Sequence, residues 1–186
     1  MPKILRKTEF GNPILRATPQ LLSDEEIRSS DTRQLIEDMY HTLKYREYGV
    51  GIAAPQVGHS VAISTIDTKP TPTRPDLMRQ KLTIINPKIT KQYGRVFEEW
   101  EGCISGTELY AKVPRYKKVQ LSWQDEQGQR HEEDFDGFLA HVIQHEVDHL
   151  NGILFVDKVK DTESYMTFKE YKKMREQEDK GFTVTR

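Results

Sequence analysis

The sequence has almost no cysteine and no long hydrophobic run. Its 186 residues include one cysteine, Cys103, which excludes an intrachain disulfide and fits a reducing compartment. No stretch approaches the roughly 18 apolar residues of a membrane span, and no apolar signal segment follows residues 1–7. We therefore expect a cytoplasmic protein that makes no membrane contact.

An excess of charge of one sign is also missing, as are internal repeats and low-complexity tracts. The 28 basic and 29 acidic residues leave a formal net charge of −1, so direct contact with nucleic acid is not predicted. The length suits one domain, residues 1–186, which can bury its own core without disulfides. The proline-rich residues 68–75 are expected to form an exposed loop within this domain.

The most informative motif is His-Glu-x-x-His, formed by His145, Glu146 and His149. Around it, residues 138–151 are predicted to form a helix, because apolar side chains recur at helical spacing and Gly152 suits a left-handed C-terminal cap. These apolar residues are Leu139, Val142, Ile143, Val147 and Leu150. In such a helix the two histidines lie one turn apart on one side, with the glutamate beside them.

This pattern is typical of a metal site. Two neutral imidazoles can bind a divalent ion, and the glutamate can exchange protons with a water on that ion. The alternative is a solvated polar face that carries three histidines, since His141 lies on the same stripe. His141 is a poor third ligand, because it lies two turns, about 12 Å, from His149. The helix therefore leaves the third ligand open.

Two other segments combine small residues with one polar or reactive side chain. Residues 49–56, Gly-Val-Gly-Ile-Ala-Ala-Pro-Gln, form a compact segment that delivers Gln56. This segment lacks the Lys-Ser/Thr of a P-loop and the third glycine of a dinucleotide fingerprint, so a phosphate-binding role is weakly supported. Residues 101–105, Glu-Gly-Cys-Ile-Ser, surround Cys103, which is a candidate buried thiol, nucleophile or ligand.

The remaining pattern predicts an α+β fold. Residues 32–45 are predicted to form a helix with Asp31 as its N-cap, residues 4–22 to be extended or irregular, and a final helix to open at residues 166–171. Strands are predicted over the ranges 61–66, 81–85, 117–123, 130–135 and 153–156. We expect antiparallel strands around a central metal-binding helix, with an N-terminal packing helix and a C-terminal helix.

The three motifs, in this order along the chain, resemble the signature motifs of peptide deformylases. These metallohydrolases remove the N-formyl group from the initiating methionine of new bacterial polypeptides. The resemblance extends from Gly11 to Asp157, most of the chain. It implies a single catalytic domain that releases formate from N-formylmethionyl nascent peptides. The ribosome is a candidate partner through the final helix, although Tyr171 and Met174 are more simply explained by packing on the domain.

The resemblance also implies a complete ligand set. The metal would be held by Cys103, His145 and His149, with a fourth position open for water. A site with three protein ligands and one open position is typical of catalysis. One thiolate and two imidazoles suit iron(II), zinc, cobalt(II) or nickel(II), and the family typically uses ferrous iron.

Further residues receive roles in the same way. Glu146 would act as general base and then as general acid. The side chain of Gln56 and the backbone N–H of Ile104 would donate to the oxyanion. Glu101 is expected to orient a ligand. The residues expected at the substrate are Gly51, Gly106 and Glu101.

The sequence departs from the family pattern at two places. Many members continue after the cysteine motif with an apolar residue, proline and glycine, whereas this chain has Gly106, Thr107 and Glu108. We expect a looser segment and an acidic group near the path of the substrate. Many members also have arginine where this chain has His141, which we expect to alter a salt bridge without contact to the metal.

Alternative functions depend on other partners for the two histidines. A metzincin protease would need a third histidine where this chain has Phe155, whereas a gluzincin could use Glu170. A noncatalytic peptide-binding protein on the same scaffold is the other alternative, and the altered residues 106–108 are its best support. A structural zinc site is disfavoured, because such sites close with four protein ligands.

Overall fold

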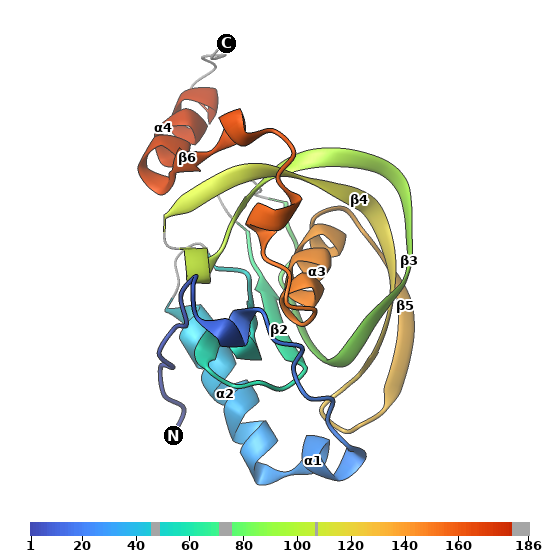
Figure 1. The fold of residues 1–186 in the computed structure, drawn as a ribbon. Helices are drawn as coiled ribbons and strands as arrows, with labels where there is room; N and C mark the ends of the chain where they lie inside the picture. Colours follow the sequence, from blue (N-terminus) through green and yellow to red (C-terminus); the bar gives the residue numbers. More distant parts are fainter. Residues whose placement is uncertain (46–48, 71–75, 107, 180–186) are drawn as a thin grey trace.

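The computed structural model describes residues 1–45, 49–70, 76–106 and 108–179. Its centre is a six-stranded antiparallel sheet with the order β1-β2-β3-β4-β5, in which β6 also pairs with β4 (Figure 1). The strands are β1 (Gly51–Ala53), β2 (Ile63–Thr68), β3 (Gln80–Gly102), β4 (Leu109–Gln124), β5 (Arg130–Asp136) and β6 (Met166–Thr167).

Helices precede, interrupt and follow this sheet. The α-helices are α1 (Asp24–Arg28), α2 (Ser30–Lys44), α3 (Gly137–His149) and α4 (Phe168–Asp179). Short 3-10 turns are η1 (Pro13–Leu15), η2 (Ala54–Val57), η3 (Ile104–Gly106), η4 (Phe155–Lys158) and η5 (Thr162–Ser164). Among the described residues, no helix is both long and apolar enough to cross a membrane. The predicted α+β class, with antiparallel strands and a helix at each end, is confirmed.

The strands β3 and β4 form a long curved hairpin around α3 (Figure 1). Shifts of register between Ile85 and Val96 interrupt the ladder, and such bulges bend a strand and increase its twist. The apolar side of α3 packs on the sheet with Ile143 fully buried and Val142 and Val147 nearly so. This packing fixes α3 within the curve and sets the direction of its histidines.

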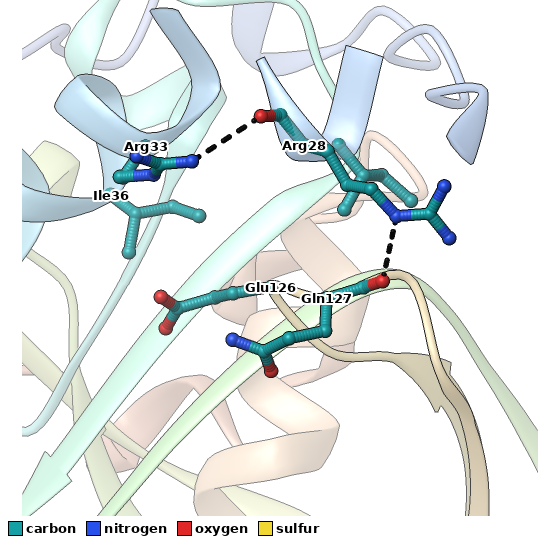
Figure 2. Close-up of a pocket in the computed structure, with 6 residues that line it drawn as sticks. Arg28, Arg33, Ile36, Glu126 and Gln127 are labelled. Atoms are coloured by element: carbon teal, nitrogen blue, oxygen red, sulfur yellow. Dashed lines mark hydrogen bonds between the residues drawn. The ribbon is translucent and has the colours of Figure 1, made fainter. Parts of the chain in front are cut away.

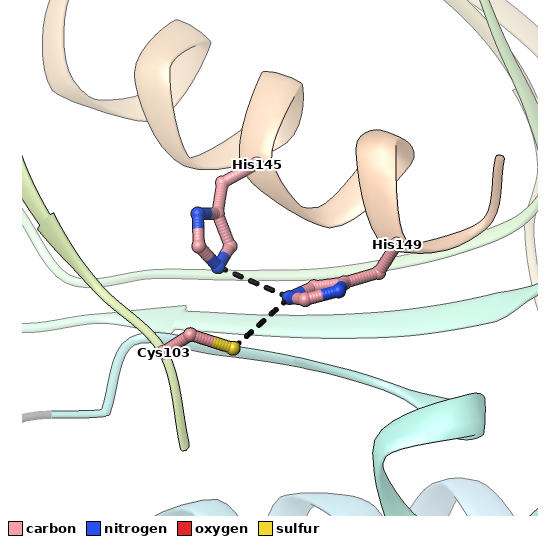
Figure 3. A group of neighbouring side chains, drawn as sticks. All are labelled: Cys103, His145 and His149. Carbon is pink, nitrogen blue, oxygen red and sulfur yellow. Dashed lines mark hydrogen bonds between the residues drawn. The ribbon is translucent and has the colours of Figure 1, made fainter. Parts of the chain in front are cut away.

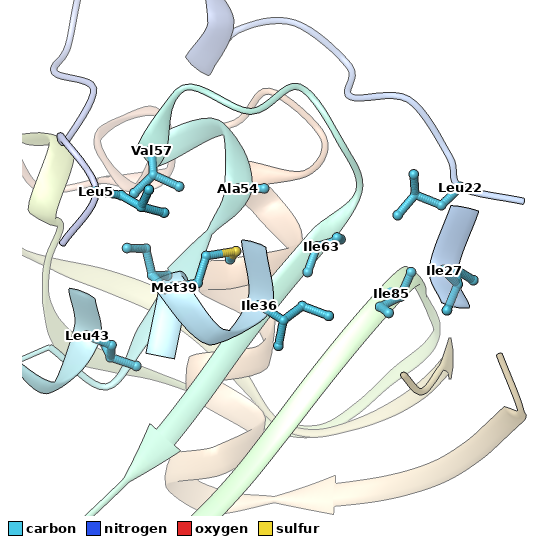
Figure 4. Close-up of a cluster of buried hydrophobic side chains, with 11 residues drawn as sticks. Leu5, Leu22, Ile27, Ile36, Met39, Leu43, Ala54, Val57, Ile63 and Ile85 are labelled. Atoms are coloured by element: carbon cyan, nitrogen blue, oxygen red, sulfur yellow. The ribbon is translucent and has the colours of Figure 1, made fainter. Parts of the chain in front are cut away.

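The helix α2 covers the β1–β2 end of the sheet. Figure 4 shows Ile36 and Met39 of α2 in one buried cluster with Ile63 of β2 and Ile85 of β3. The first residues of the chain run along the same helix, since the backbone N–H of Lys3 donates to Asp38 and that of Leu5 to Thr42, each at 2.8 Å. The N-terminal segment is therefore attached to the core of the domain.

At the N-terminal side, one local prediction is corrected and one helix was not predicted. The cap of α2 is Ser29 rather than Asp31, because the Ser29 hydroxyl accepts the N–H of Thr32 at 3.2 Å and starts the helix two residues earlier. The short helix α1 was not predicted, although Ser23 and Glu26 form a capping box there.

Four predictions about strands and loops have mixed outcomes. The strand predicted over 81–85 is the start of the much longer β3. The predicted strand 153–156 is wrong, because Leu154 N–H donates to Asp157 at 2.8 Å and the apolar run continues as the turn η4 with Phe155 buried. Of the predicted loop, residues 71–75 lie outside the described residues. The hairpin of β4 and β5 is confirmed.

Candidate metal centre and active site

The side chains of Cys103, His145 and His149 converge on one point (Figure 3). The Sγ atom of Cys103 lies 3.3 Å from Nε2 of His149, and this Nε2 atom lies 3.2 Å from Nε2 of His145. Both histidines come from neighbouring turns of α3, whereas Cys103 lies between the end of β3 and η3. The helix therefore supplies two ligand atoms, and the long hairpin brings the third.

The spacing of these atoms fits a single divalent ion. In a tetrahedral site, metal–nitrogen distances of about 2.1 Å and metal–sulfur distances of about 2.3 Å place neighbouring ligand atoms about 3.4–3.6 Å apart. The observed separations of 3.2 and 3.3 Å are close to these values. Three protein ligands would leave one position open for a water or a substrate oxygen. The donor set therefore fits a catalytic metal site.

Glu101 fixes the orientation of one ligand. Its Oε2 atom lies 2.8 Å from Nδ1 of His145, which leaves Nε2 of that ring directed at the ligand point. Its Oε1 atom lies 3.0 Å from Nε2 of His141, whose ring contacts Phe97 and Phe138. His141 thus contacts Glu101 and is not one of the three converging residues, and its effect on a salt bridge stays a prediction. Glu101 is thus an orienting group behind the metal site.

Arg115 of β4 completes the surroundings of Glu101. Its guanidinium donates to both carboxylate oxygens, at 2.6 and 3.0 Å, and to Asp148 with a third nitrogen. The side chains of Arg115 and Glu101 are each 2% exposed, and buried charges of this kind are tolerated when they are paired. The contact between Arg115 and Asp148 was not predicted from the sequence, because it depends on the register of β4 against the other elements.

These contacts set the protonation states around the ligand point. Burial alone would raise the pKa of the Cys103 thiol, but His149 and His145 hold this pKa well below its ordinary value. Burial alone would lower the pKa of His145, but Cys103 and Glu101 raise it well above its ordinary value. Burial also opposes ionisation of Glu101, and its three cationic or imidazole partners nevertheless lower its pKa strongly. His149 and His145 therefore favour the thiolate form of Cys103, which is the form that binds metals.

Glu146 faces a different set of neighbours. The hydroxyl of Ser64 in β2 donates to Oε2 of Glu146 at 3.0 Å. The backbone of β1 comes so close that a Cβ atom on Gly51 would lie 2.3 Å from Oε1. Gly51, which was predicted at the substrate, therefore gives room to this carboxyl group. Burial raises the pKa of Glu146, and the charges of His145 and His149 offset this only in part.

Gln56 in η2 is held with its amide nitrogen toward the ligand point. Its Oε1 atom accepts the N–H of Ala53 at 2.8 Å, and its Nε2 atom donates to Sγ of Cys103 at 3.1 Å. The side chain is 1% exposed. Because the carbonyl end has its own donor, the NH₂ end is fixed toward the site. Ile104, the other predicted oxyanion donor, follows Cys103 as the first residue of η3.

Residues 3–10, here named the N-terminal strap, tie two site segments together. The N–H of Thr8 donates to the carbonyl of Gln56 at 2.7 Å, and the N–H of Phe10 donates to the carbonyl of Ser105 at 2.9 Å. The Phe10 ring packs on Phe155, and a Cβ atom on Gly106 would lie 2.8 Å from this ring. Gly106, another residue predicted at the substrate, is therefore buried beneath the strap.

The structure thus brings most of the predicted site residues together around one point and places Glu101 behind them. The three ligand candidates, Gln56 and Glu146 lie around one point, as expected. For Glu101, contacts with an arginine and two histidines favour the orienting role over a substrate contact. Ser64 was missed, and its only signal is a hydroxyl residue within the buried strand β2.

The fold and the site define a class. A curved antiparallel sheet around a helix, three converging metal-binding atoms and a buried carboxyl group with a raised pKa are the arrangement of a metal-dependent hydrolase.

Comparisons with known proteins identify the family within this class. The profile of the family described as Polypeptide deformylase matches residues 4–165. A peptide deformylase of Leptospira biflexa is 38% identical over 167 residues, which cover 88% of this chain and 90% of that protein. One of Wolinella succinogenes is 40% identical over 155 residues, which cover 81% of this chain and 85% of that protein.

Solved structures that resemble this chain are also peptide deformylases. A class I type b peptide deformylase from Acinetobacter baumannii, with Met-Ala-Ser bound, has a TM-score of 0.81 and 36% identity, and the match covers 86% of this chain and 100% of that chain. A peptide deformylase from Synechococcus elongatus, in complex with actinonin, has a TM-score of 0.75 and 36% identity over 97% of this chain and 87% of that chain. The chain belongs to the polypeptide deformylase family.

Membership of this family settles the main alternatives. The predicted hydrolase that removes formyl groups from newly made peptides is confirmed. A metalloprotease or a noncatalytic peptide-binding protein finds no support in these relatives and structures, which are peptide deformylases.

Proposed function

We propose that this chain hydrolyses N-formylmethionyl peptides at the point where Cys103, His145 and His149 converge. In this reaction water adds to the formyl carbon, the carbon–nitrogen bond breaks, and formate and a free amine leave. The observation that carries the proposal is the position of three metal-binding atoms beside the buried Glu146 and the amide of Gln56.

The proposed reaction requires a divalent metal ion. A divalent ion held by Cys103, His145 and His149 would supply Lewis acidity, which activates water and polarises a carbonyl group. We propose iron(II), while zinc, cobalt(II) and nickel(II) suit the same donors. The lowered pKa of Cys103 and the bond from Nδ1 of His145 to Glu101 support this ligand set.

The remaining steps use side chains and backbone of the chain itself. Glu146 takes a proton from the attacking water and returns it to the departing nitrogen. Its raised pKa supports this role, since such a carboxyl group holds a proton more readily than an exposed one. The amide of Gln56 and the backbone N–H of Ile104 donate to the formyl oxygen as it gains negative charge.

We propose one catalytic domain over residues 1–186, acting in the cytoplasm on nascent chains. Tyr171 of α4 packs on Trp100 and Tyr110, with ring centroids 5.8 and 4.3 Å apart, which supports a packing role for this face. Contact with the ribosome would then use the opposite face of α4. An effect of Glu108 on substrate preference is a separate prediction.

Formate release tests the proposed function. Protein loaded anaerobically with iron(II) or nickel(II) is given a short N-formylmethionyl peptide, the matched N-acetylmethionyl peptide, or a longer unblocked peptide. We expect formate from the formylated peptide, no acetate from the acetylated peptide, and no internal cleavage of the unblocked peptide. Metal-stripped protein is the control. Absence of formate from folded, loaded protein would refute the proposal, and internal cleavage would revive the metalloprotease alternative.

A further inference from the structure

Ser64 joins three elements at the carboxyl group of Glu146. It lies in β2 and is 0% exposed. Its Oγ atom lies 2.9 Å from the carbonyl oxygen of Ile52 in β1 and 3.0 Å from Oε2 of Glu146 in α3. A buried hydroxyl is costly unless it is hydrogen-bonded, and both partners of this one lie at the site. The hydroxyl is therefore satisfied by two hydrogen-bond partners, and one of them, Glu146, is the proposed proton carrier.

We propose that Ser64 is a positioning residue, whose hydroxyl holds the carboxyl group of Glu146 in the orientation that proton transfer requires. The inference rests on the proposed role of Glu146. It goes further by naming the group that orients this carboxyl group.

The terminal torsion of a glutamate needs such a contact. The last torsion of this side chain joins an sp³ carbon to an sp² carbon, and its energy profile is broad. In this site the backbone of Gly51 closes one side at Oε1, and Ser64 binds Oε2. The two contacts act on different oxygens, so together they restrict rotation of the carboxyl plane. Gly51 alone limits space, whereas Ser64 adds a directed bond.

A hydroxyl also suits a group that gains and loses a proton. It can donate to an ionised carboxyl group, and it can accept from a protonated one while it donates to the carbonyl of Ile52. Ser64 thereby keeps a hydrogen bond to Glu146 in both forms. An alanine at this position keeps neither.

The test compares two buried hydroxyl groups of the same strand. Ser64→Ala removes the hydroxyl at Glu146, and Ser64→Thr retains a hydroxyl there. Thr65→Val is the matched control, because Thr65 is 0% exposed and its Oγ1 has no hydrogen-bond partner among the described residues. For each variant, kcat and KM for the formylated peptide, bound metal and the thermal unfolding midpoint are measured.

We expect Ser64→Ala to lower kcat by up to about a hundredfold, the effect of a misplaced reacting group. We expect KM and metal content to be unchanged, Ser64→Thr to recover most of kcat, and Thr65→Val to stay within about twofold of the parent. A folded, metal-loaded Ser64→Ala with the parent's kcat would overturn the proposal. An equal loss in Thr65→Val would do the same, since it would reveal a general effect of the strand.

A crystal structure of metal-free Ser64→Ala separates this inference from the proposed function. We expect the carboxyl group of Glu146 to turn away from its position beside β2 while α3 stays in place. An unchanged carboxyl orientation would overturn the positioning role, even if the parent protein released no formate. Failure to release formate would count against the proposed function alone.

Discussion

The two sides of the site each contain one buried glutamate, with opposite surroundings. Glu101 on the β3–β4 side is 4% exposed and meets an arginine and two histidines, which lower its pKa strongly against the effect of burial. Glu146, facing β1 and β2, is 3% exposed and meets a serine hydroxyl and a glycine backbone, and burial raises its pKa. The surroundings therefore favour the charged form of the carboxyl group on one side and its protonated form on the other.

This difference shows how neighbours assign roles to identical side chains. Carboxyl groups whose pKa values are pushed apart are suited to different tasks in one site. The arginine that fixes the charge of Glu101 is delivered by the long strand β4, whereas β2 brings only a neutral hydroxyl to Glu146. The asymmetry is thus built by the strands on either side of α3.

The largest expected effect comes from removing the proton acceptor. Glu146→Gln keeps the shape of the side chain but cannot accept a proton from water. We expect kcat to fall by about 10²- to 10⁴-fold, the usual contribution of a general base, while metal content stays at the parent level. Steady-state formate release and metal analysis of the same sample measure this. A variant that retains a tenth or more of the parent's kcat would exclude Glu146 as the main base.

The next effect tests the charged side of the comparison. Arg115→Met leaves Glu101 without its cationic partner, and we expect the free energy of unfolding to fall by about 3–5 kcal/mol, as for other broken buried pairs. Urea unfolding of the metal-free protein measures this loss. The double variant Arg115→Met/Glu101→Leu removes both members of the buried pair, and Lys158 still lies 3.4 Å from Asp148, so part of the stability should return. A single variant as stable as the parent would mean that the histidines alone satisfy Glu101.

The smallest expected effect concerns pH and metal binding. Cys103 and Glu101 raise the pKa of His145, so this ring keeps a proton to higher pH than a free imidazole, and below the raised pKa an ion must displace that proton to bind. Affinity should therefore decrease by about tenfold for each pH unit below the raised pKa. Competition with a chelator across a pH series measures this. In Glu101→Gln, one cause of the raised pKa is weakened, so the decrease should begin at lower pH. An affinity that does not change with pH would contradict this account.

The parts of the site that follow from local spacing could be predicted from the sequence. The helix around His145 and His149 depends on residues one turn apart, and Gly152 has the left-handed conformation, with φ +69°, that its position suggested. Cys103 is a different case. Its approach to the histidines depends on the whole course of β3, so the residues alone left its role open and the family resemblance supplied it.

The missed features depend on contacts between distant segments. Two of the bulges in β3 lie at Pro87 and Gly94, residue types that disturb a regular strand ladder. Arg115 and Ser64 reach the site only through the packing of β4 and β2 against α3. The apolar run 153–156 has the composition of a strand, but Asp157 turns it into a 3-10 turn by accepting the N–H of Leu154. Composition does not reveal any of these pairings.

The N-terminal strap has a practical consequence for anyone who handles this protein. Through Thr8 and Phe10 it holds the carbonyl groups of Gln56 and Ser105, so a tag ahead of Lys3 would extend a segment that is bonded to both parts of the site. The helix α4 lies at the far end of the molecule from the N-terminus (Figure 1). It also lies away from the cavity of about 390 Å³ near Arg28 and Glu126, which is beside α1 and α2 (Figure 1 and Figure 2). Purification tags and surface tethers therefore belong after α4, where immobilised enzyme would keep its chemistry intact.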